Sequence, residues 1–143
     1  MGNIERNIPE QEAEDNITVL LVEDDEAVAE MYRTRLELDG YTVIQAGDGV
    51  EALHKATDLR PDLIFLDLRL PVLDGFGVLE ILRAQPQTAM IPVVIVSNYG
   101  EPELVEKGLK LGALDYLVKS KTTPGQLSSG VLSWANVEDA KPS

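Results

Sequence analysis

The chain of 143 residues carries a formal charge of −13 at pH 7, has no cysteine and has a single histidine, His54. This composition excludes a disulfide framework and a thiolate site, and one histidine cannot by itself make a zinc site. The negative charge disfavours direct binding to nucleic acid, whose phosphates attract lysine and arginine. The length fits one domain, and no apolar run approaches the ~20 residues that cross a membrane, so we expect a cytoplasmic protein without a membrane contact.

Three segments follow one another along the chain. Residues 1–16 are acidic and poor in large apolar side chains, which predicts a disordered leader. A folded domain is expected over residues 17–136, and a loose polar tail over residues 137–143. Within the domain, short apolar runs predict strands at 18–22, 41–46, 64–67, 93–96 and 114–118. Helical spacing of apolar residues predicts helices between them at 26–38, 48–60, 74–82, 103–111 and 123–134.

The alternation of strands and helices predicts the fold class. Parallel strands joined by single helices need right-handed crossovers, so we expect an α/β protein with a doubly wound, five-stranded parallel sheet and five helices. Strand order 2-1-3-4-5, the flavodoxin-like order, is expected for such a sheet. The helix at 103–111 should be the softest, because Gly108 in its middle costs about 1 kcal/mol relative to alanine.

Polar side chains come directly after several predicted strands. Asp24 and Asp25 follow the first strand and Asp67 ends the third, and the carboxyl ends of these neighbouring strands share one edge of the sheet. Carboxylates crowded there would repel one another unless a cation joined them, and hard oxygen ligands of this kind suit Mg²⁺. Ser97 and Lys119 end the next two strands at the same edge. For the acidic run alone, a second interpretation is open: Asp25 caps a helix and its neighbours face solvent.

The motifs together resemble the receiver domain of bacterial two-component response regulators over about residues 17–134. The shared residues, in chain order, are Asp24-Asp25, Leu66-Asp67-Leu68-Arg69-Leu70-Pro71, Asp74-Gly75, Ser97, Gly112-Ala113-Leu114-Asp115-Tyr116 and Lys119. The resemblance implies that the domain is a phosphorylation-dependent switch or a phosphorelay receiver in signal transduction.

The resemblance also implies roles for the acids. Asp67 would accept a phosphoryl group from a histidine kinase or a phosphotransfer protein. Asp25, Asp67 and the backbone carbonyl of Arg69 would hold Mg²⁺, and Asp24 would act on the metal through water. Such a domain would catalyse only its own phosphorylation and dephosphorylation.

Three further roles belong to the implied switch. Lys119 would pair with the phosphoryl group, Ser97 would hydrogen-bond it, and Tyr116 would turn inward when Ser97 moves. The added charge would change the face made by helix 103–111, strand 114–118 and the last helix, where an unknown downstream protein would bind.

One departure from the family concerns the residue after the lysine. The family usually has a proline there, often in the cis form, whereas this chain has Ser120. We expect a cis Lys119–Ser120 bond, because the residues on both sides keep the receiver pattern. Arg69 and Tyr99 are a second departure, at the mouth of the family's site.

Three other functions can be compared with this one. A flavin carrier with the same strand order is rejected, because the acids after the first strand would repel a phosphate. A magnesium-dependent phosphatase with an aspartyl-phosphate intermediate usually has a second acid two residues after the nucleophile, where this chain has Arg69. A receiver that is never phosphorylated and only binds partners is the third alternative.

Overall fold

The computed structural model describes residues 16–135, so the predicted leader apart from Asn16, and the whole predicted tail, lie outside the described residues. One parallel sheet runs through the molecule in the order β2-β1-β3-β4-β5, which confirms the predicted topology. Its strands are β1 (Thr18–Val22), β2 (Thr42–Ala46), β3 (Leu63–Leu66), β4 (Val93–Ser97) and β5 (Asp115–Val118).

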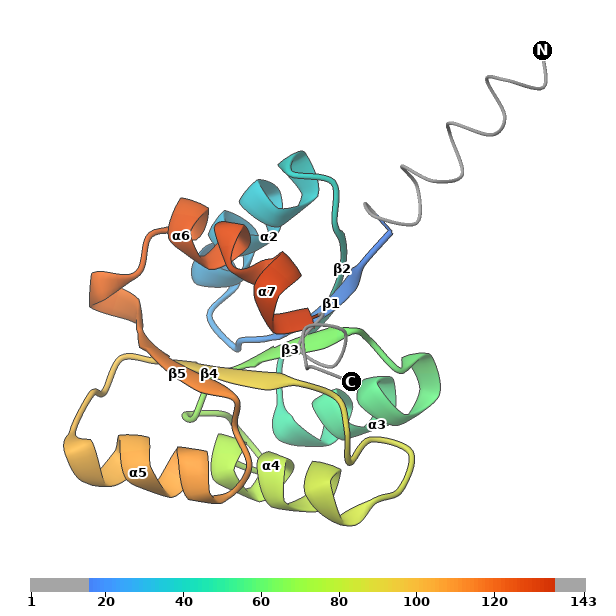
Figure 1. Ribbon diagram of the computed structural model, residues 1–143, viewed down its shortest axis with the longest axis vertical. Helices are drawn as coiled ribbons and strands as arrows, with labels where there is room; N and C mark the ends of the chain where they lie inside the picture. The colour runs from blue at the N-terminus through green and yellow to red at the C-terminus, as the bar shows by residue number, and fades with distance from the viewer. Residues whose placement is uncertain (1–15, 136–143) are drawn as a thin grey trace, which may run out of the picture.

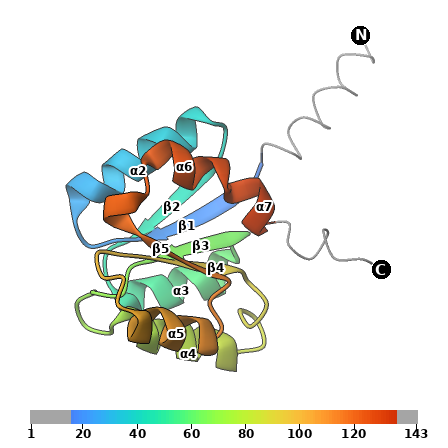
Figure 2. The same cartoon turned by 60° about the vertical axis from the view of Figure 1, so that its left-hand side comes forward.

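Helices cover both faces of the sheet (Figures 1 and 2). On one face lie α2 (Glu26–Leu38), α6 (Pro124–Ser129) and α7 (Val131–Ala135). On the other lie α3 (Gly49–Leu59), α4 (Gly75–Ala84) and α5 (Pro102–Lys110). None of the described helices has both the length and the apolar character that a membrane span requires.

The two layers of helices enclose separate hydrophobic cores. Side chains alternate along β3, so Ile64 and Leu66 enter the core beneath α3 and α4, while Leu63 and Phe65 enter the core beneath α2, α6 and α7. All four are at most 1% exposed. A central parallel strand with both faces covered is apolar throughout, which is why this run predicted a buried strand from sequence.

Local hydrogen bonds begin the helices where the sequence predicted. Thr123 and Gln126 form a reciprocal capping box at α6. At α3 the Asp48 side chain accepts from the backbone N–H of Glu51 at 2.7 Å, but the Glu51 carboxylate accepts from Gly47 rather than from Asp48. At α3 the second hydrogen bond of a capping box is therefore made by the residue before the N-cap.

The last predicted helix is divided at Gly130 into α6 and α7. The Trp134 ring lies against Gly130, where an added Cβ would be 2.6 Å from the nearest ring atoms. The same ring meets Phe65 edge-on with 5.7 Å between centroids, and its Nε1–H donates to Asp115 Oδ2 at 3.3 Å. The break at Gly130 therefore gives the Trp134 ring room to pack there, and its contacts with Phe65 and Asp115 hold α7 against the sheet.

The predicted cis bond between Lys119 and Ser120 is wrong, because residues 16–135 contain no cis peptide bond. A single 3₁₀ turn, η1 (Lys119–Lys121), redirects the chain instead. The Thr122 N–H donates to the Lys119 carbonyl at 3.2 Å, and the Thr122 hydroxyl donates to the Val118 carbonyl at 2.9 Å. The turn needs no cis bond, which before serine would cost ~2.5–4 kcal/mol.

The packing of Trp134 on glycine gives a first prediction. Gly130→Ala should lower the free energy of unfolding by about 1–3 kcal/mol and shift the tryptophan emission, because the new methyl group displaces the Trp134 ring. Trp134 is the single tryptophan of the chain, so fluorescence reports this site alone. Gly47→Ala is the control, since its Cβ would lie 3.9 Å from the nearest side chain. Wild-type emission and stability in Gly130→Ala would show that the ring does not need the glycine.

Candidate functional site

Two acids and a lysine meet at the carboxyl edge of the sheet. Strand pairing sets Val22 of β1 beside Leu66 of β3, so the next residues, Glu23 and Asp67, are neighbours. Lys119 is the residue after β5, and its Nζ lies 2.5 Å from Glu23 Oε1 and 3.0 Å from Asp67 Oδ2. Their side chains are only 4–11% exposed, so this is a buried group of three charges.

The electrostatics of the group follow from its burial. Burial raises the pKa of Glu23, and the hydrogen bond from Lys119 opposes that rise in part. Burial also acts to lower the pKa of Lys119, but the two carboxylates outweigh it and the pKa is raised. Lys119 is therefore a permanent positive charge that holds the two acids together.

A third acid completes a carboxylate cluster. One oxygen each from Glu23, Asp24 and Asp67 all lie within 4.8 Å of one another. They line an open hollow of about 230 Å³ beside Lys119 and Tyr99. Carboxylates beside an open space suit Mg²⁺, which binds one or two of them and keeps several waters. The donor set fits the predicted metal.

Asp25, predicted as a direct metal ligand, lines the same hollow but is not one of the three clustered carboxylates. Its Oδ1 accepts from the backbone N–H groups of Ala27 and Val28 at 3.0 and 3.2 Å, which makes it the N-cap of α2. The geometry therefore favours Glu23 and Asp24, one residue earlier than predicted, and the metal-binding role of Asp25 remains a prediction. A usable signal was present, because Glu23 follows the last residue of its strand as Asp67 follows the last residue of β3.

Ser97, predicted as the switch hydroxyl, is fully buried at the end of β4. Its Oγ accepts from the Tyr99 N–H at 3.0 Å. The Tyr116 hydroxyl donates to the carbonyl of the same Tyr99, and burial raises the pKa of Tyr116. Tyr116 is already half-buried against the core, and one peptide segment connects it to Ser97.

Arg69 and Tyr99, both expected at the mouth of the site, contact each other. The Arg69 guanidinium lies 4.6 Å from the centroid of the Tyr99 ring, a cation–π contact. The Arg69 N–H donates to Asp67 Oδ1 at 3.3 Å. The role predicted for the Arg69 carbonyl remains a prediction.

Comparison with known proteins identifies the family. The family described as "Response regulator receiver domain" matches residues 19–129. The chain belongs to this family. The resemblance inferred from the sequence is therefore confirmed, and with it the expected kind of function, a phosphorylation-dependent signalling switch.

Two curated relatives and two solved structures define the likeness. The dual master transcriptional regulator RpaA of Synechocystis sp. is 43% identical over 101 residues, which is 71% of this chain and 42% of that protein. PhoP of Bacillus subtilis, an alkaline phosphatase synthesis regulator, is 43% identical over 104 residues, which is 73% of this chain and 42% of PhoP. The chain thus spans about two fifths of these relatives.

The solved structures match over nearly their whole length. Chemotaxis protein CheY4 of Vibrio cholerae superposes with a TM-score of 0.76 at 33% identity, covering 82% of this chain and 98% of CheY4. The receiver domain of a Pseudomonas aeruginosa sensor histidine kinase has a magnesium ion coordinated in its active site cleft. It superposes with a TM-score of 0.77 at 30% identity, covering 85% of this chain and 98% of that domain.

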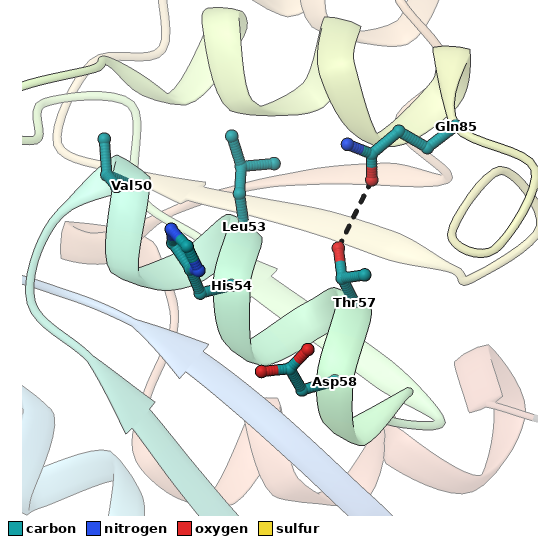
Figure 3. Close-up of a pocket in the computed structure, with 6 residues that line it drawn as sticks. All are labelled: Val50, Leu53, His54, Thr57, Asp58 and Gln85. Atoms are coloured by element: carbon teal, nitrogen blue, oxygen red, sulfur yellow. Dashed lines mark hydrogen bonds between the residues drawn. The ribbon is translucent and has the colours of Figure 1, made fainter.

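A second hollow of this receiver domain, of about 340 Å³, lies along α3 (Figure 3). His54 and Asp58 line it beside Thr57, whose hydroxyl lies 3.3 Å from Gln85 Oε1. None of the predicted site residues is among its lining side chains. His54 is exposed there.

Separating capping from metal binding gives a second prediction. Asp25→Ala should lower stability by about 1 kcal/mol, because the α2 cap is lost, whereas Asp25→Asn should keep the cap and the stability. Magnesium titration should give near wild-type affinity for Asp25→Asn and strongly weakened affinity for Asp24→Asn. Equal weakening in both asparagine variants would restore Asp25 to the ligand set.

Proposed function

We propose that Asp67 accepts a phosphoryl group from a histidine kinase or a phosphotransfer protein. The observation that carries the proposal is the environment of its carboxylate, which is 7% exposed, 3.0 Å from the Lys119 Nζ and next to two further acids. A buried carboxylate with a fixed cation beside it is suited to accept phosphorus, because this reaction depends on positioning and on neutralising charge.

The bond changes balance without a further reactant. The Asp67 carboxylate oxygen attacks the phosphorus of a phosphohistidine, an O–P bond forms, and the N–P bond breaks with the electron pair left on the imidazole. Lys119 neutralises an oxygen of the transferred group. Glu23, Asp24 and Asp67 would hold Mg²⁺, which would supply further positive charge, and the related Pseudomonas structure with magnesium supports this assignment.

Phosphorylation would then alter the contacts of Ser97. The new group adds a charge of about −1.5 to −2 and strong acceptor oxygens, which favour donation from the Ser97 hydroxyl. Ser97 now accepts from the Tyr99 N–H, and the Tyr99 carbonyl accepts from Tyr116. A change at Ser97 would therefore be felt by Tyr99 and Tyr116, and through them by the face of α5, β5 and α6.

The domain would act in the cytoplasm and catalyse only its own phosphorylation and dephosphorylation. An unidentified downstream protein would bind the altered face, while direct contacts with nucleic acid or membrane are not part of the proposal. The phosphatase alternative has little support at Arg69, whose side chain lies over Tyr99 and offers no acid.

Intact mass after incubation with acetyl phosphate and Mg²⁺ tests the proposal. Wild type should gain one phosphoryl group that base removes, and the gain should need the metal. Asp67→Asn should gain nothing, Lys119→Ala should gain little, and Asp58→Asn, a control in an exposed acid of α3, should behave as wild type.

Each other outcome favours an alternative. Phosphorylation that persists in Asp67→Asn would assign the group to another residue. No gain in wild type would leave the binding-only receiver, and turnover of an added phosphomonoester would indicate the phosphatase.

The switch is tested by amide chemical shifts. Ser97→Ala should still be phosphorylated at Asp67 but should lose most of the shift changes in α5 and β5, because no hydroxyl passes the change to Tyr99. Ser129→Ala, which removes an exposed hydroxyl in α6, should keep them. A full set of shift changes in Ser97→Ala would remove this hydroxyl from the switch.

A further inference from the structure

Val72, in the loop between β3 and α4, has an unusual backbone conformation. Its φ is 73°, and within residues 16–135 it is the only β-branched residue with a positive φ. The Leu73 N–H donates to the Pro71 carbonyl at 2.8 Å, which closes a tight three-residue turn centred on Val72. Such turns are rare and strained, and a β-branched residue with φ in this range is an outlier.

Close contacts on both sides fix the turn. Gly49, at the start of α3, lies so near that an added Cβ would be 2.1 Å from the Leu73 carbonyl oxygen. Gly75 closes the loop, since its Cβ would lie 2.3 Å from the Asp67 carbonyl oxygen. Backbone strain persists where the surroundings determine the conformation in this way, and it is concentrated at functional sites.

The packing of this chain does not explain a valine at this position. The Val72 side chain is 79% exposed, so it buries little apolar surface. Glycine would adopt the same φ without strain, and glycine does occupy the positive-φ positions 40 and 112. Among residues 16–135 this exposed side chain therefore gains little from packing, which points to a use in contact with a partner.

The position of Val72 indicates which partner. The loop begins at Asp67, and five residues span at most about 18 Å when extended. The loop is shorter than that, because the Gly75 N–H donates to the Leu68 carbonyl at 2.9 Å. An interface of standard size covers about 800 Å² on each partner, a disc of roughly 16 Å radius. A protein that brings phosphorus into contact with Asp67 must centre such a disc there, so it covers Val72.

We propose that Val72 is a contact residue for the protein that donates the phosphoryl group. It would pack against an apolar side chain that the donor presents beside its phosphorylated histidine. This inference rests on the proposed function of Asp67. The fixed turn holds the side chain outward before binding, so little conformational entropy is lost when the donor docks. A downstream protein has no comparable need to cover this loop.

Phosphotransfer to wild type, Val72→Thr and Val72→Leu tests the inference. Threonine keeps the shape, the branched Cβ and the strained backbone but replaces a methyl group by a hydroxyl, whereas leucine stays apolar. The protein donors are the histidine kinases of the source organism, autophosphorylated with ATP, and its phosphotransfer proteins, phosphorylated by those kinases. Acetyl phosphate is the small-molecule donor. Transfer from the preferred protein donor should fall about tenfold in Val72→Thr and stay within about twofold in Val72→Leu. Acetyl phosphate should label all three at the same rate.

The outcomes separate this inference from the proposed function. Labelling by acetyl phosphate with unchanged transfer from the protein donor to Val72→Thr overturns the contact and leaves Asp67 as acceptor. An equal loss with acetyl phosphate and with the protein donor also overturns it, because Val72 would then act on the site itself. Labelling of wild type by acetyl phosphate but by none of the kinases or phosphotransfer proteins excludes a protein donor of this kind. Absence of any labelling rejects the proposed function and the contact with it.

Thermal unfolding of Val72→Gly is the second measurement. If the side chain serves a partner, the midpoint should stay or rise, because the strain is relieved and no packing is lost. A lower midpoint in both Val72→Gly and Val72→Ala would show that Val72 stabilises its own chain, and the inference would be wrong, because alanine removes the packing without the extra freedom that glycine gives the unfolded chain.

Discussion

The contact of Lys119 with Glu23 and Asp67 is the constraint on which the site depends. The three residues follow β5, β1 and β3, whose carboxyl ends share one edge of the parallel sheet, and the order β2-β1-β3-β4-β5 makes β1 and β3 neighbours there. Each acid would be unfavourable alone in this buried position, because burial favours the neutral form. The positive charge of Lys119 stabilises the two buried carboxylates. The sheet topology brings the three groups together, and their ion pairs in turn stabilise that edge of the sheet.

Tyr99 connects this charged group to the rest of the domain. Its ring lies under the Arg69 guanidinium, its N–H donates to Ser97, and its carbonyl accepts from Tyr116. Arg69 in turn donates its N–H to Asp67. In the proposed switch, a change in charge at Asp67 would reach Tyr99 by two routes. One passes through Arg69, and the other through the Ser97 hydroxyl once that hydroxyl donates to the phosphoryl group.

The sequence was sufficient for the strands, the strand order and the positions of Asp67, Ser97 and Lys119, because each follows a buried apolar run. It failed where register or tertiary packing decides. Four consecutive acids look alike until pairing of Val22 with Leu66 selects Glu23. The break at Gly130 depends on a tryptophan that folds back over it, and the trans bond after Lys119 depends on a turn closed by Thr122. The local sequence pattern does not predict any of these three contacts.

The way α5 is attached explains why its face suits an output. Arg83 of α4 donates two hydrogen bonds to the Gly112 carbonyl, at 3.1 and 2.9 Å, and so fixes the chain just beyond the C-terminal end of α5. At the other end, near Tyr99, Glu101 makes no side-chain cap. Gly108, expected from sequence only to soften the helix, lets it rest on Ile95, since an added Cβ would lie 2.5 Å from that side chain. With one end held and the other end free of a cap, a displacement at Tyr99 would tilt α5 about its C-terminal end rather than move the whole helix, and the largest change would occur beside the phosphorylation site.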